Sequence, residues 1–141
     1  MSRYEQRIEI AARVEHAWSV MSDVTRWREW TASITRVEPL GSAPLMLGAR
    51  YRVLQPRLQP NVWTVTVLEP PRAFEWVSRT GGLTVVARHT LTPSATGCSL
   101  ELVVEYSGFL AGLVDLLAGR LTRQYMQLEA EGLKRRSETP R

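Results

Sequence analysis

The sequence contains little cysteine and little histidine. Its 141 residues include one cysteine, Cys98, and two histidines, His16 and His89. A single cysteine excludes an internal disulfide, and one thiol with two imidazoles is too few for a thiolate-rich zinc site. We therefore expect no metal, and no motif in the chain points to a cofactor.

Long hydrophobic runs are also missing. The longest apolar stretch, from Gly108 to Gly119, is interrupted by Asp115, and it is shorter than the roughly 20 residues of a membrane-spanning helix. Residues 1–10 alternate charged and apolar side chains, unlike the basic start and apolar run of a secretory signal. The sequence predicts a cytoplasmic protein without integral membrane association.

Basic residues exceed acidic ones, for a formal net charge of +4, but they are spread along the chain. Only Lys134, Arg135 and Arg136 form a run. Because basic stripes, and not basic totals, mark nucleic-acid-binding proteins, we expect no nucleic-acid partner. Protein partners are not indicated by any pattern.

Signatures of the familiar catalytic classes are absent as well. The chain has no G-x-S-x-G elbow, no phosphate-binding loop, no dinucleotide-binding G-x-G-x-x-G, no paired carboxylates and no Ser-His-Asp arrangement. Its hydrophobic (44%) and charged (23%) fractions are nevertheless those of a globular protein. We expect residues 1–141 to form a single domain.

Alternating polar and apolar residues predict seven strands. They are expected over residues 3–10, 33–40, 50–55, 61–68, 72–78, 82–92 and 98–106. In the second of these, Ile34 and Val37 can share a face only across a bulge. Short turns between the strands are typical of an antiparallel meander, whose apolar face needs a large cover.

Helical periodicity is found near both ends of the chain. One apolar stripe begins at Val14, and Trp27 and Trp30 lie three apart, which predicts two short helices with both indoles inward. After Phe109 a longer stripe predicts a C-terminal helix that covers the sheet, with these residues on its apolar face: Leu110, Leu113, Val114, Leu117, Leu121, Tyr125 and Leu128. The polar tail after Lys134 is expected to fray.

Polar residues share the inward alternation of several strands: Gln6, Gln55, Ser78, His89 and Tyr106. Burying an amide or imidazole without a partner costs about 1 to 3 kcal/mol, so these groups need a neighbour, water or a ligand. Mainly apolar cavities with a few polar groups are the usual form of small-molecule sites. We therefore predict an internal cavity, with the loop at 40–48 and its Leu45, Met46 and Leu47 as a cover for the mouth.

The candidate ligand-binding residues are aromatic and polar side chains expected on the inner face. They are Trp27, Trp30, Tyr51, Gln55, Trp63, Trp76, Ser78 and His89. Two alternatives stay open, because the tryptophans also suit a plain core and His89 also suits a core histidine bonded to a neighbour. Gln55 is the better candidate for ligand contact, since glutamine is seldom fully buried without a polar partner.

Residues 12–30, ARVEHAWSVMSDVTRWREW, resemble the start of the START-like superfamily, also called SRPBCC. Further matches are GARYRVLQP at 48–56, WTVTVLEPPRAFEW at 63–76 and GLTVVARHTLTP at 82–93. The resemblance implies an α+β helix-grip (Bet v 1-like) fold, in which a seven-stranded antiparallel curved sheet surrounds a long C-terminal helix, with two short helices near the N-terminus. It also implies the polyketide cyclase/dehydrase-like branch, which includes aromatase/cyclases and lipid carriers.

Two functions fit these observations. A binding protein for a small hydrophobic molecule that is lipid-, isoprenoid- or polyketide-like needs only a cavity and a few polar anchors. The alternative is a polyketide cyclase/aromatase or dehydratase with His89 as acid/base and Tyr106 as donor to an enolate, although no arginine alternates inward as such cyclases are expected to require. A third class, an interaction module, would need a large exposed apolar patch.

Overall fold

A seven-stranded antiparallel sheet dominates the computed structural model, which describes residues 2–41 and 44–139. The strands are β1 (Ser2–Ile10), β2 (Arg36–Pro39), β3 (Arg50–Leu54), β4 (Asn61–Glu69), β5 (Ala73–Thr80), β6 (Leu83–Ser94) and β7 (Gly97–Ser107). Their order in the sheet is β1-β7-β6-β5-β4-β3-β2. Strands β2 to β7 therefore form a meander, and β1 pairs with the last strand.

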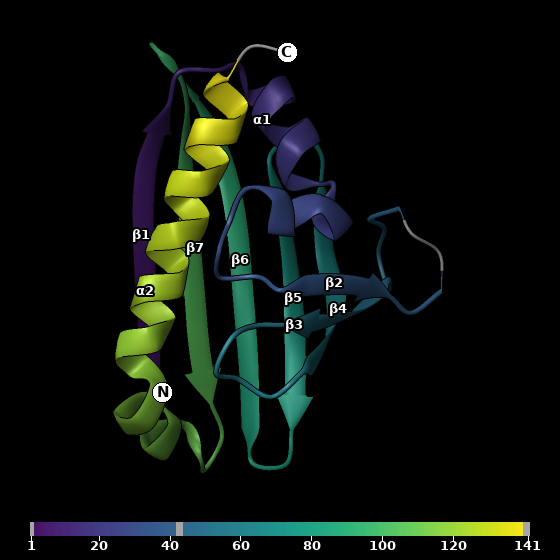
Figure 1. Ribbon diagram of the computed structural model, residues 1–141, viewed down its shortest axis with the longest axis vertical. Coiled ribbons are helices and arrows are strands. Elements are labelled where there is room, and N and C mark those ends of the chain that lie inside the picture. Colours follow the sequence, from purple (N-terminus) through teal and green to yellow (C-terminus); the bar gives the residue numbers. More distant parts are fainter. Residues whose placement is uncertain (1, 42–43, 140–141) are drawn as a thin grey trace.

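Three helices cover the concave side of this sheet: α1 (Val14–Met21), the 3-10 helix η1 (Val24–Glu29) and α2 (Ala111–Glu138). In Figure 1, α2 lies along β1 and β7, while β2 and β3 cross in front of β5 because the sheet is strongly curved. This arrangement is the helix-grip fold predicted from the sequence. No described helix combines the length and the apolarity of a membrane span.

The turn between β5 and β6 positions the start of α2. Thr80 pairs with Leu83, which leaves Gly81 and Gly82 as a two-residue turn. Gly82 has a φ of +81°, a conformation that favours glycine. Its carbonyl accepts a hydrogen bond of 2.9 Å from the Leu110 amide, and a Cβ on Gly82 would stand 2.6 Å from Cζ of Phe109.

The C-terminal end of α2 is fixed to the N-terminal part of the chain. Oε2 of Glu138 accepts hydrogen bonds from the Ala11 amide at 2.7 Å and from Nζ of Lys134 at 2.6 Å. Lys134 also donates to the Glu9 carbonyl at 3.0 Å. The expectation that the tail frays after Lys134 is therefore wrong as far as Glu138, while residues 140–141 lie outside the described part of the chain.

Two expectations about local structure are corrected. β2 begins only at Arg36, so Ile34 lies before the strand. Ile34 and Val37 can therefore both be buried without a bulge between them. The irregularity in register lies instead in β4, between Val65 and Val67.

The apolar face of α2 also differs from the expected stripe. Leu113 and Leu117 are 53% and 75% exposed, while Val114 and Ala118 face the interior. The apolar stripe is wider than the strip of helix surface that the sheet can cover. In the first turns of α2, Val114 and Ala118 turn inward and Leu113 and Leu117 turn outward. Farther along the helix, Leu121 and Tyr125 of the expected stripe do line the cavity.

Candidate functional site

A cavity of about 300 Å³ lies between α2 and the inner face of the sheet. Its walls come from strands β3 to β7 on one side and from the middle of α2 on the other, and Trp27 of η1 also lines it. Most of the lining is apolar, including Val53, Trp63, Trp76, Val85 and Leu102 from the strands and Val114, Ala118, Leu121 and Met126 from the helix. This composition and this enclosure are typical of small-molecule sites.

The structure brings six of the predicted residues together at the cavity. They are Trp27, Gln55, Trp63, Trp76, His89 and Tyr106. Gln55 also has the polar partner that its burial requires, because its Nε2 donates to the Ser33 carbonyl at 3.2 Å. That these side chains contact a ligand stays a prediction.

Three other predicted residues are buried away from the cavity lining. The Trp30 backbone packs against Gly132 of α2. The Tyr51 ring contacts Trp76, with ring centroids 6.0 Å apart, and Ser78 is 4% exposed. Strand alternation placed Tyr51 and Ser78 on the correct face of the sheet, but the cavity occupies only part of that face.

His89 lies in the inner wall and is 4% exposed. Its ring stacks on Phe74, with centroids 4.1 Å apart and planes 7° apart, and its Nδ1 lies 3.3 Å from the Phe74 carbonyl oxygen. Because a carbonyl can only accept a hydrogen bond, Nδ1 carries a proton and donates it. Nε2 is then left to face the opposite wall.

Glu129 of α2 faces this second nitrogen. Its Oε1 lies 3.3 Å from Nε2 of His89; the atom is buried and has no hydrogen bond of good geometry in the structure. A neutral imidazole with its proton on Nδ1 presents a lone pair to this carboxylate oxygen. A proton held between the two atoms, or a donor from a bound molecule, would remove that unfavourable contact.

A second polar pair lies along the same helix. The Tyr106 hydroxyl is hydrogen-bonded to Oγ1 of Thr122, and Thr122 donates its own proton to the Ala118 carbonyl at 2.9 Å. Tyr106 is therefore the donor of this pair. Burial raises the pKa of the Tyr106 hydroxyl, so the phenol stays neutral near neutral pH.

Sequence reasoning placed Tyr125 on the inward stripe of the last helix but missed Thr122 and Glu129. Thr122, Met126 and Glu129 follow the i, i+4, i+7 spacing of one helix face, and a carboxylate on that face was the available signal. It was not used because the expected stripe was drawn through apolar residues only.

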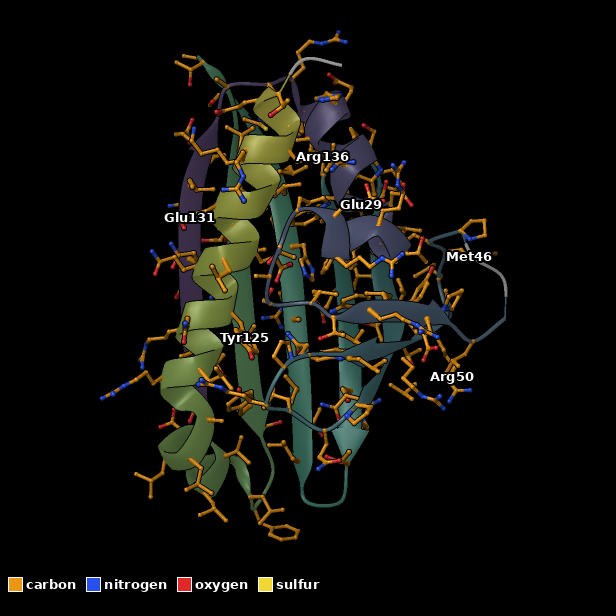
Figure 2. The ribbon with its side chains drawn as sticks, in the orientation of Figure 1. Glu29, Met46, Arg50, Tyr125, Glu131 and Arg136 are labelled. Carbon is orange, nitrogen blue, oxygen red and sulfur yellow. The ribbon has the colours of Figure 1, made fainter. Side chains whose placement is uncertain are left out.

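The mouth of the cavity is bordered by the loop between β3 and β4. Leu58 and Gln59 lie at its edge, and Tyr125 of α2 donates a hydrogen bond to the Pro56 carbonyl. Figure 2 shows Tyr125 on α2, far from Met46. The expectation that the loop at 40–48 covers the mouth is wrong for its described residues, because Met46 and Leu47 are 50% and 62% exposed and do not line the cavity; residues 42–43 lie outside the described chain.

Arg88 borders the cavity, but its guanidinium is paired with Glu75 at 2.9 Å and with Glu105. Among the described residues, no three His, Cys, Asp or Glu side chains gather closely enough to hold a metal ion. The polar groups of the inner walls are His89, Glu129, Tyr106 and Thr122, and Gln55, Gln59 and Asn61 add polar groups to the lining.

Comparison with known families gives a match over nearly the whole chain. The model of a family described as "Polyketide cyclase / dehydrase and lipid transport" matches residues 1–138. A comparison with curated proteins gives no match.

Solved structures of similar fold include proteins of different kinds. Protein CV1439 from Chromobacterium violaceum has a TM-score of 0.74 at 15% identity, covering 99% of this chain and 100% of that one. The di-domain ARO/CYC StfQ of the steffimycin biosynthetic pathway has a TM-score of 0.77 at 13% identity, covering 96% of this chain and 50% of that one. Norcoclaurine synthase from Thalictrum flavum, in complex with dopamine and hydroxybenzaldehyde, has a TM-score of 0.75 at 11% identity, covering 99% and 89%. At these identities the likeness shows the fold.

Proposed function

Because this chain belongs to the polyketide cyclase/dehydrase and lipid transport family, we propose that it binds a small hydrophobic molecule in the cavity between the sheet and α2. The observation that carries the proposal is a mainly apolar cavity of about 300 Å³ whose lining includes the buried His89–Glu129 pair. The family description covers both enzymes and carriers, so the site itself has to indicate the ligand.

The apolar part of the cavity supplies the affinity. Trp27, Trp63 and Trp76 line it and are at most 9% exposed. Burial of apolar surface contributes roughly 25 cal/mol per Å², and aromatic rings add contacts of defined geometry. A flat or branched hydrocarbon skeleton, such as that of an isoprenoid, lipid or polyketide, suits these walls.

The His89–Glu129 pair indicates one hydrogen-bond donor on the ligand. Oε1 of Glu129 is buried without a hydrogen bond, and leaving such an atom without a partner costs about 1 to 3 kcal/mol. A ligand hydroxyl placed there would donate to Glu129 beside His89. The preferred ligand is therefore hydrophobic with a hydroxyl or phenol group at one end.

Binding of naphthalene and 2-naphthol tests both parts of this proposal. The two probes share one ring system and differ by a hydroxyl, and quenching of tryptophan fluorescence reports binding. We expect both to bind, with 2-naphthol about tenfold tighter because of the bond to Glu129. Glu129→Gln should reduce that preference, while the control Glu131→Gln, on the exposed side of α2 (Figure 2), should leave it unchanged.

The outcomes separate the two parts. If neither probe binds, the function as a hydrophobic binding protein is wrong. If both bind equally in the wild type, the cavity binds ligands but the role of Glu129 is wrong.

A second candidate function is a cyclase or dehydratase, and the His89–Glu129 pair favours it. Nδ1 of His89 is oriented by the Phe74 carbonyl, and Glu129 lies 3.3 Å from Nε2. An oriented imidazole beside a carboxylate is suited to removing a proton next to a ketone and returning it to a leaving hydroxyl.

Hydrogen–deuterium exchange next to the carbonyl of 2-tetralone, followed by NMR in D₂O, tests this second candidate. An enzyme should accelerate the exchange above the buffer rate. His89→Gln should abolish the acceleration, whereas His16→Gln, which changes the histidine outside the cavity, should not. Exchange at the buffer rate in the wild type would reject the enzyme, and only the proposed binding function would remain.

A further inference from the structure

The start of α2 carries a group of exposed apolar side chains. Phe109, Leu113, Leu116 and Leu117 are 86%, 53%, 81% and 75% exposed. The three leucines follow i, i+3, i+4 spacing and share one face of the helix, and Phe109 precedes its first turn. We call these four residues the α2 end patch. Clusters of exposed large apolar residues mark interaction sites far more often than isolated ones do.

Basic residues border the α2 end patch. Arg120 is exposed and lies three and four residues after Leu117 and Leu116, on the same face. Arg79 is exposed near the end of β5, beside the Gly81–Gly82 turn that contacts Phe109. Neither arginine has an ion-pair partner within the described ranges, unlike Arg3, Arg26 or Arg88.

The one carboxylate in this part of α2 does not oppose the basic residues. Asp115 lies two residues after Leu113, and a helix turns about 100° per residue. Asp115 therefore lies on the other side of the helix, near Gly119, which packs against Tyr4 of β1. The exposed face is apolar at its centre and positive at its edge.

The α2 end patch is continuous with the wall of the cavity. Val114 and Ala118, which lie on the same turns of α2 as the exposed leucines, line the cavity. Leu83 lines it too, and it directly follows Gly82, the residue that contacts Phe109. Figure 1 shows the start of α2 and the β5–β6 turn at the same end of the molecule. Whatever covers the patch therefore lies next to this end of the cavity.

We propose that the α2 end patch docks on the surface of an anionic lipid membrane. Phe109 and the leucines enter the boundary between headgroups and acyl chains, and Arg79 and Arg120 pair with lipid phosphates. A second copy of the chain is a poorer occupant, because a symmetric contact would bring the same unpaired arginines together. Docking in this orientation places the cavity next to the acyl chains, where hydrophobic molecules dissolve.

Co-sedimentation of the full chain with lipid vesicles tests the proposal. We expect binding to vesicles of equimolar phosphatidylcholine and phosphatidylglycerol, and much weaker binding to phosphatidylcholine alone. The double variant Leu116→Gln/Leu117→Gln should weaken binding to the anionic vesicles roughly tenfold or more. Arg79→Gln/Arg120→Gln should weaken binding to the anionic vesicles only.

A matched control comes from the loop before β3. Met46→Gln/Leu47→Gln removes exposed apolar side chains of similar size far from the α2 end patch (Figure 2). It should sediment with anionic vesicles like the wild type. Circular dichroism checks that every variant is folded, which we expect because all the changed side chains are exposed.

Three results would overturn the proposal. The first is a wild-type chain that sediments with neither kind of vesicle. The second is equal loss of binding in the patch variant and in the loop control. The third is a dimer in analytical ultracentrifugation that the Leu116→Gln/Leu117→Gln variant converts to monomer, since the patch would then be covered by a second copy.

Discussion

Gly132 of α2 lies directly against the backbone of Trp30: a Cβ at position 132 would stand less than 3.0 Å from the Trp30 carbonyl oxygen. Real Cβ atoms do not approach other atoms so closely. The close approach of α2 to the segment after η1 therefore depends on the lack of a side chain on Gly132. This contact and the hydrogen bonds of Glu138 hold the C-terminal half of the helix in place.

Gly132→Ala should destabilise the protein by about 1 to 3 kcal/mol, because α2 or the Trp30 backbone must shift. The control is Gly112→Ala in the same helix, where an added Cβ meets nothing within 4 Å. That change should stabilise the fold by up to about 1 kcal/mol, since alanine is the better helix former. Urea unfolding measures both, and equal effects of the two changes would contradict the packing described.

The contacts of Glu138 should make stability depend on acid pH. The hydrogen bond from the Ala11 amide, followed by Lys134, lowers the pKa of Glu138 from its usual 4.5. A group whose pKa is lowered on folding stabilises the folded state above its unfolded pKa, and the contribution is lost as pH falls through the folded pKa. The difference in Tm between wild type and Glu138→Gln should therefore shrink below about pH 4.5.

Thr139→Val is the control for this pH series. Thr139 donates to the Arg135 carbonyl at 2.6 Å and has no ionisable group. Its effect on Tm should not follow the same pH dependence. A Glu138→Gln difference that is constant with pH would mean that the ionised carboxylate does not hold the helix end.

Tyr106 should titrate later than an exposed tyrosine. Burial raises the pKa of its hydroxyl above the usual 10.0. The neutral phenol therefore stabilises the folded state fully below the unfolded pKa of 10.0, and this stabilisation is lost as pH rises through the folded pKa. Burial also raises the pKa of Tyr51. In a titration that follows phenolate absorbance, Tyr106→Phe should remove part of the absorbance change that occurs at the highest pH. If it removed absorbance change near the usual tyrosine pKa instead, the buried position of Tyr106 would be contradicted.

Filling the cavity from α2 should block ligand binding without unfolding the protein. Ala118→Phe places a large apolar side chain in the cavity, and its backbone carbonyl still accepts the bond from Thr122. We expect at least roughly tenfold weaker naphthalene binding, because the new ring occupies the ligand's space. Leu116→Phe, at an 81% exposed position of the same helix, is the control and should bind naphthalene as the wild type does.

Much of the fold was predictable because it depends on local patterns. The seven strands were located to within a few residues, since a strand with one buried face must alternate. The 33–40 segment was the exception: β2 holds only Arg36–Pro39, because Ile34 reaches the core from outside the strand.

The candidate site was predictable only on the sheet side. His89, Trp63 and Trp76 alternate with outward residues, so their face was fixed by the strand period. Helix periodicity is weaker evidence, because a wide apolar stripe allows several rotations. Leu113 and Leu117 were expected inside and lie outside, and Glu129 was not considered although it faces His89.

The sequence by itself determined the order of strands and helices along the chain, the inward face of each strand and the presence of a long last helix, because these follow from the spacing of apolar residues along the chain. The tertiary structure decided the rotation of α2 and the pairing of His89 with Glu129. It also decided that the β3–β4 loop forms the edge of the cavity mouth. These depend on the curvature of the sheet and on close contacts such as Gly132 with Trp30. Such contacts join residues far apart in the chain, and no local pattern records them.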